Sequence, residues 1–176
     1  MRIIALLSIA FISVIFSYCI QFTYAIEPLL HDKDLKIEKV YEGLSFPVSI
    51  SFLGNNDILV LEKNNGTVNR IVNGQMIDKS LLQVNVDNTG EGGLVGSAVH
   101  VNSSGSTNVY LYSTELANMT KDNNATDSLE KNYTVAKVSK YDLVDGKLTN
   151  PKLLFKLPFH QDIPYHVSGK MVIGPR

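Results

Sequence analysis

The chain has 176 residues, with 16 Lys or Arg against 17 Asp or Glu and a formal net charge of −1. This near balance excludes the strongly basic surface that nucleic-acid-binding proteins use to neutralise phosphate groups. The one cysteine, Cys19, lies in an apolar leader. If that leader is removed, no cysteine remains for a disulfide, a zinc site or a nucleophile.

The first 25 residues form this leader. Arg2 is the only charged residue before Glu27, and residues 3–20 are almost wholly apolar. A basic start, an apolar helix and a small-residue exit at Ala25 are typical of a secretory signal, so we expect export to the periplasm, cell surface or extracellular space. A retained membrane anchor formed by residues 3–20 is the alternative, because about 20 apolar residues span a bilayer. Residues 26–36 are expected to form a linker.

The pattern after the leader is that of an all-β protein. Short apolar or alternating runs are separated by Gly, Asn and Asp, and no amphipathic helix is indicated. A polar stretch at 118–130 is expected to be an inserted surface loop, with a short helix over 127–132 as the alternative. Ten strands are predicted: Ile37–Tyr41, Val48–Phe52, Ile58–Glu62, Thr67–Ile71, Leu82–Val86, Val95–Val101, Val109–Ser113, Tyr133–Asp142, Lys152–Lys156 and Lys170–Ile173.

A loose internal repeat favours a β-propeller over a sandwich or a barrel. Residues 49–74 read as strand, turn, strand, turn, strand, with Asn73-Gly74 as a tight-turn dipeptide, and residues 133–155 repeat the closing half around Asp145-Gly146. Repeats of this size would give residues 37–176 about two to three propeller blades. Gly174-Pro175 is a turn signal that promises another strand. We therefore expect the chain to be the front part of a larger repeating β protein.

Five Asn-x-Ser/Thr triplets fall near predicted turns or loops, which agrees with glycosylation of an exported chain. Their asparagines are Asn65, Asn102, Asn118, Asn124 and Asn132.

Two segments stand apart from ordinary strand and turn sequence. In residues 89–100, three glycines flank Glu91 just before an apolar strand, which lets the backbone pass close to a bound group. A bulged turn with a solvated carboxylate is the alternative. In residues 165–175, His166 precedes a short apolar run. A histidine of ordinary pKa is largely neutral at pH 7 and suits a general base, although a structural role is the more common one.

In this order, the segments resemble the soluble pyrroloquinoline-quinone (PQQ)-dependent glucose/sorbosone dehydrogenase family. The resemblance covers roughly residues 40–176. The matching parts are Leu44-Ser45-Phe46-Pro47, residues 58–63 with Gly66-Thr67-Val68, residues 91–96 running to His100, Tyr110-Leu111-Tyr112, and His166-x-x-Gly169-Lys170-x-Val172-x-Gly174-Pro175.

This resemblance implies a six-bladed propeller that oxidises a sugar, with PQQ and calcium as cofactors and an external electron acceptor. It assigns His166 as the base that takes the proton from the sugar hydroxyl, and Glu91 as a residue beside cofactor and substrate. His100 is interpreted as packing and His160 as loop surface. Some family members carry an Asp directly before the base, where this chain has Tyr165; Asp162 is the other candidate for orienting the base.

The family's basic residues that hold the quinone, and its calcium ligands, lie later in the family pattern than residue 176. The metal-site prediction for this chain is therefore none, and the 176 residues are expected to be inactive alone. A non-catalytic extracellular propeller that binds carbohydrate or protein is the alternative to an enzyme.

Overall fold

The computed structural model describes residues 28–77, 79–116, 134–158, 165 and 169–174. The leader, the stretch at 118–130 with its alternative helix, His160, Asp162 and His166 lie outside the described residues. The chain divides into two compact units, residues 1–38 and 39–176. The described part of the first unit contains neither helix nor strand.

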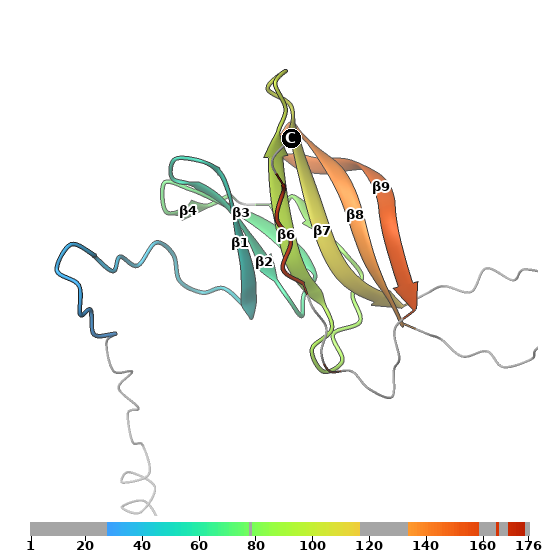
Figure 1. Cartoon of the computed structure of the whole chain (residues 1–176), viewed down its shortest axis with the longest axis horizontal. Coiled ribbons are helices and arrows are strands. Elements are labelled where there is room, and N and C mark those ends of the chain that lie inside the picture. Colours follow the sequence, from blue (N-terminus) through green and yellow to red (C-terminus); the bar gives the residue numbers. More distant parts are fainter. Residues whose placement is uncertain (1–27, 78, 117–133, 159–164, 166–168, 175–176) are drawn as a thin grey trace, which may run out of the picture. The chain divides into compact units, whose positions relative to one another are not determined.

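The second unit contains two antiparallel sheets and, among its described residues, no helix, which confirms the all-β prediction (Figure 1). In the first sheet the order is β1-β2-β3-β4, with β5 also paired to β3; the second is a meander of order β6-β7-β8-β9. The strands are β1 (Pro47–Gly54), β2 (Asp57–Glu62), β3 (Thr67–Val72), β4 (Gln75–Met76), β5 (Leu82–Gln83), β6 (Leu94–Val101), β7 (Thr107–Leu116), β8 (Thr134–Val144) and β9 (Lys147–Pro158).

Seven of the predicted strands correspond to β1, β2, β3, β6, β7, β8 and β9, and the one at Leu82–Val86 shrinks to β5. The strand predicted at Ile37–Tyr41 is wrong, because this segment has no strand assignment. Ile37 is 51% exposed and Val40 is 57% exposed. A segment with an apolar pattern forms a strand only where it can pair with a neighbouring strand and bury one face.

The turn dipeptides are confirmed in conformation. Asn73 and Gly74 have φ of 50° and 76°, and Asp145 and Gly146 have φ of 48° and 71°. Two successive residues of positive φ make the tight turn whose twist matches the flanking antiparallel strands. These dipeptides therefore fix the β3–β4 and β8–β9 connections.

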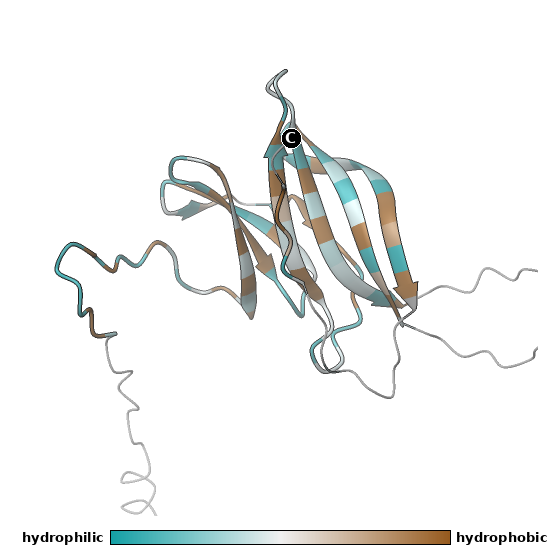
Figure 2. Ribbon diagram, in the orientation of Figure 1, coloured by the Kyte–Doolittle hydropathy of each residue, from teal (hydrophilic) through white to brown (hydrophobic). Residues whose placement is uncertain are grey.

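The hydrophobic core lies between the two sheets. Leu59, Leu61 and Val68 of the first sheet pack with Leu94 and other residues of the second, all at most 6% exposed. The brown segments of β2, β6 and β7 in Figure 2 follow this pattern. The two sheets also meet at β1 and β6, where the Ser97 hydroxyl lies 3.0 Å from that of Ser49 and 2.8 Å from that of Ser51.

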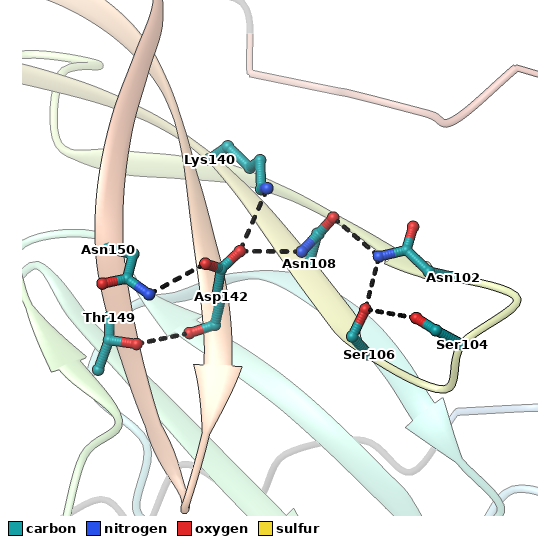
Figure 3. A network of polar contacts seen from close by, with 8 residues as sticks. All are labelled: Asn102, Ser104, Ser106, Asn108, Lys140, Asp142, Thr149 and Asn150. Carbon is teal, nitrogen blue, oxygen red and sulfur yellow. Dashed lines mark hydrogen bonds and ion pairs between the residues drawn. The ribbon is translucent and has the colours of Figure 1, made fainter.

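A polar network holds one end of the second sheet, with Asp142 at its centre (Figure 3). Its carboxylate accepts hydrogen bonds from Asn150 Nδ2 at 3.1 Å and Asn108 Nδ2 at 3.0 Å, and pairs with Lys140 Nζ at 3.2 Å. The bonds from Asn150 and Lys140 hold the pKa of Asp142 below its usual value. Asn102, one of the five candidate glycosylation sites, belongs to this network because its Nδ2 donates to Asn108 Oδ1 at 3.2 Å.

Glu62, at the end of β2, should make stability depend on pH. It is only 9% exposed, and it accepts hydrogen bonds from Ser45 N and Thr67 Oγ1, both at 2.7 Å. Burial alone would raise the pKa of Glu62, but these bonds outweigh it and the net shift is downward from 4.5. A carboxyl whose folded pKa is depressed stabilises the fold above its unfolded pKa, and that stability is lost as pH falls through the folded pKa.

We expect Glu62→Gln to lower the free energy of unfolding at pH 7 by about 1–3 kcal/mol. The gap to the unsubstituted protein should narrow below about pH 4, as the native carboxyl is protonated. Urea unfolding at both pH values measures this gap. Glu38→Gln, at an exposed ion pair with Lys36, is the control and should change little. A gap that stays constant from pH 7 to about pH 3 would contradict the assignment to the Glu62 carboxylate.

Candidate functional site

An open cleft of about 740 Å³ lies where the first strands of the two sheets meet. It brings together the two segments singled out from the sequence, the Glu91 loop and the residues that follow His166. The lining residues are Phe46, Val48, Ser49, Ile50, Lys63, Gly90, Glu91, Val95, Ser97, Gly169, Lys170 and Met171. His166 lies outside the described residues, between Tyr165, which is 61% exposed, and Gly169.

The Glu91 loop is fixed from beneath by a buried threonine. Thr114 of β7 is fully buried; its Oγ1 accepts a hydrogen bond from Gly93 N at 2.6 Å and donates one to Asp87 O at 2.7 Å. Burial alone would raise the pKa of Asp87, but the hydroxyls of Thr134 and Thr89 and the Thr89 amide lower it overall. The two ends of the loop are thus tied to β7, which leaves exposed Glu91 at the rim of the cleft.

Gly93 allows β2 to approach this loop closely. It has φ of 134°, and a Cβ at this position would lie 2.5 Å from Lys63 O and 2.8 Å from Lys63 Cγ. Leu94 N donates a hydrogen bond to Lys63 O at 3.0 Å. Gly93 thus allows the close backbone approach that was expected for a bound group, and the group that it admits in this structure is Lys63 of the same chain.

Lys63 completes the polar part of the cleft, and sequence reasoning gave it no site role. Its Nζ donates to Gly90 O at 3.0 Å and to Asn64 Oδ1 at 3.1 Å. The sequence placed Lys63 directly after the predicted strand Ile58–Glu62, in a segment that matches the family, but without a role in a site. The close approach of that strand end to the Gly-Gly pair at 92–93 was the missing information.

The segment 169–174 lies over the face of β6 (Figure 1, red). A Cβ on Gly96 would be 1.6 Å from Gly169 O, and one on Gly169 would be 2.8 Å from Val95 Cγ2. The Cβ direction points out of a sheet, so this contact crosses the face of β6 and does not form a ladder along its edge. The strand predicted at Lys170–Ile173 is therefore wrong: none is assigned there, and Val172 is 79% exposed.

Gly96→Ala should displace this segment. The added methyl group cannot fit against Gly169 O, and comparable overpacking costs about 1–3 kcal/mol. We expect a lower free energy of unfolding and faster amide hydrogen exchange over residues 169–174, measured by mass spectrometry. Gly54→Ala is the matched control, because a Cβ there meets nothing within 4 Å. Equal exchange in the two variants would contradict the contact.

His100 is the one remaining histidine candidate that the structure describes. His100 is half-buried in β6, opposite Asn108, and is not a lining residue. Within the described ranges, no group of three or more His, Cys, Asp or Glu could hold a metal ion. A search of these same ranges for a long apolar helix that could cross a membrane found none.

Comparison with known proteins places these features in a family. The family model of Glucose / Sorbosone dehydrogenase matches residues 44–176, which is most of the chain. The chain belongs to this family. No curated protein matches it. All the residues that line the cleft lie within the matched range, residues 44–176.

Two solved structures of similar fold are a putative oxidoreductase (glucose dehydrogenase) from Thermus thermophilus and the PQQ-bound aldose sugar dehydrogenase from Streptomyces coelicolor. The first has a TM-score of 0.60 at 20% identity, over 78% of this chain and 37% of that one. The second has a TM-score of 0.59 at 24% identity, over 79% of this chain and 38% of that one. The chain therefore spans less than two-fifths of the length of these proteins.

Proposed function

We propose that this protein takes part in the oxidation of a sugar hydroxyl, with PQQ as the cofactor that accepts the hydride. Membership of the glucose/sorbosone dehydrogenase family supports the class of reaction. The observation that carries the proposal is the cleft itself: Glu91 and the Gly169–Met171 segment, far apart in sequence, line one open space of about 740 Å³.

In this proposal two residues act on the sugar. The neutral imidazole of His166 takes the proton of the hydroxyl that is oxidised, which suits a side chain whose ordinary pKa is about 6.5. The Glu91 carboxylate accepts a hydrogen bond from a sugar hydroxyl and so orients the ring at the rim of the cleft. PQQ, when bound, supplies the two-electron acceptor, and an external acceptor then reoxidises it.

The residues of the cleft fit PQQ in chemical character. Phe46, Val48, Ile50 and Met171 offer apolar surface to a flat ring system, and Lys63 and Lys170 offer positive charge to its carboxylates. Calcium is different: the described residues present no cluster of carboxylates or histidines for it, so no residue is assigned to calcium and no step involves it.

We also propose that the protein is exported by its leader, and that the 176 residues alone do not turn over sugar. The leader's basic start and apolar run support export. Two observations support the predicted inactivity: the cleft is open, and the chain spans less than two-fifths of the related structures. In this proposal, further residues are needed to enclose the ligands.

The test is dye reduction with a series of aldoses after loading with PQQ and calcium. It is run on the 176-residue chain and on the longest product of the same gene, alongside PQQ binding followed by absorbance. Sugar-dependent dye reduction by the longest product supports the proposal. Binding of sugar without PQQ binding or dye reduction would overturn it and favour a carbohydrate-binding module.

A further inference from the structure

Two cationic side chains reach the cleft from segments that are distant in sequence. Lys63 follows the last residue of β2, and Lys170 lies in the segment that covers Gly96 of β6. Both line the cleft that also contains Glu91. The polar lining therefore carries two positive charges against one negative charge, an excess that would attract an anionic ligand.

Lys63 is held in place before any ligand arrives. Its backbone N donates to Phe46 O and its backbone O accepts from Leu94 N, each at 3.0 Å. Its Nζ donates to Gly90 O and Asn64 Oδ1. An ammonium group has three N–H donors, so these two neutral oxygens leave one N–H for a further acceptor. A half-buried cation fixed by its own backbone loses little side-chain freedom on binding.

Within the part of the chain that the structure describes, Lys63 and Lys170 differ from four other lysines in having no carboxylate as an ion-pair partner. Lys36, Lys39, Lys137 and Lys140 each form an ion pair with a carboxylate. Among the described residues, no such ion pair involves Lys63 or Lys170. The cleft therefore offers ammonium groups whose charge the described carboxylates do not neutralise by direct pairing.

Apolar surface adjoins these charges. Phe46 is 66% exposed and Ile50 is 58% exposed, and both line the cleft with Met171. Exposed apolar side chains beside fixed cations suit a ligand that combines a flat aromatic body with carboxylate groups. PQQ combines both features, because it has fused aromatic rings and three carboxylate groups.

We propose that Lys63 and Lys170 form a clamp for a carboxylate of PQQ. This inference rests on the proposed function, and it assigns to this chain basic residues for the quinone, which the family resemblance placed only after residue 176. Lys63 is the fixed half, and Lys170 is the exposed half that is carried by the segment over β6. Both ammonium groups would bind as point charges rather than through a fixed fork.

The test is equilibrium dialysis of PQQ against the unsubstituted chain, Lys63→Met, Lys170→Met and the double variant. Methionine keeps an unbranched apolar stem of similar length and removes the charge. We expect each single variant to weaken PQQ binding on the order of 10-fold, as for a lost hydrogen bond to a charged group. Raising the salt concentration should weaken PQQ binding by the unsubstituted chain more than PQQ binding by the double variant. Lys152→Met, at an exposed lysine of β9, is the matched control.

The trimethyl ester of PQQ, which keeps the ring but lacks the carboxylate charges, separates the clamp from stacking. Its affinity should be nearly equal in all variants. If the unsubstituted chain binds PQQ and both Lys170→Met and the double variant bind it equally well, the clamp is wrong while the proposed function stands. If the unsubstituted chain and the longest gene product both fail to bind PQQ, the proposed function and the clamp fail together. Lys170 is exposed, so its variant reports on the clamp even if Lys63→Met does not fold.

Discussion

Replacing Leu59 by alanine should lower the free energy of unfolding by about 2–5 kcal/mol. Leu59 is fully buried in β2 and belongs to the cluster that joins both sheets. Truncation removes apolar contacts and leaves a space that the two sheets, fixed by their own ladders, cannot close. Domains of this size are stable by about 5–15 kcal/mol, so a large part of the total would be lost.

Urea unfolding followed by circular dichroism measures this loss. Leu153→Ala is the matched control, because Leu153 of β9 is the same residue type and is 52% exposed. Its change should stay below about 1 kcal/mol, as expected for a partly exposed side chain. Equal losses in the two variants would mean that the two sheets do not share one core around Leu59.

Local chemistry in the sequence was enough to predict the hairpins. Asn73-Gly74 and Asp145-Gly146 adopt positive φ because few other residues do so at low cost, and their position sets the register of the strands on either side. β1, β2, β3 and β8 lie within a few residues of their predicted ranges, whereas β9 begins at Lys147, directly after Asp145-Gly146 and five residues before its predicted start at Lys152.

Pairing between distant segments could not be predicted in the same way. Ile37–Tyr41 and Lys170–Ile173 have the composition of strands, but neither is assigned as one. At Leu82–Val86 the ladder stops after Gln83, although Val84 N still donates to Gly66 O at 2.8 Å. Whether an apolar run becomes a strand depends on an available edge, and composition does not report that.

The candidate site shows the same division. Glu91 was singled out from its glycine neighbours and from family resemblance; it lines the cleft, and its role there stays a prediction. Lys63 was missed because its place depends on Gly93, where a Cβ would lie 2.5 Å from Lys63 O. The contact of Gly96 with Gly169 depends likewise on two glycines that no local pattern relates. A glycine in the sequence can indicate that another segment approaches the backbone closely, but it does not identify that segment.

His166→Ala should lower the turnover of the sugar-oxidising form of the protein by about 10²–10⁴-fold, the usual contribution of a general base. PQQ affinity should be unchanged, because the cofactor-facing lysines and apolar residues of the cleft are retained. A general base must be neutral to act, so turnover of the unsubstituted protein should rise with pH over the range in which the imidazole loses its proton. The variant should lose that limb of the pH profile.

His100→Gln is the control for this experiment, since His100 is a half-buried histidine of β6 that does not line the cleft. Its turnover and its pH profile should match those of the unsubstituted protein. Adding imidazole to His166→Ala should restore part of the activity if a small base can enter the open cleft. Undiminished turnover in His166→Ala with PQQ fully bound would exclude this residue as the base. Another group at the cleft would then have to accept the proton, and the Glu91 carboxylate would be the next candidate.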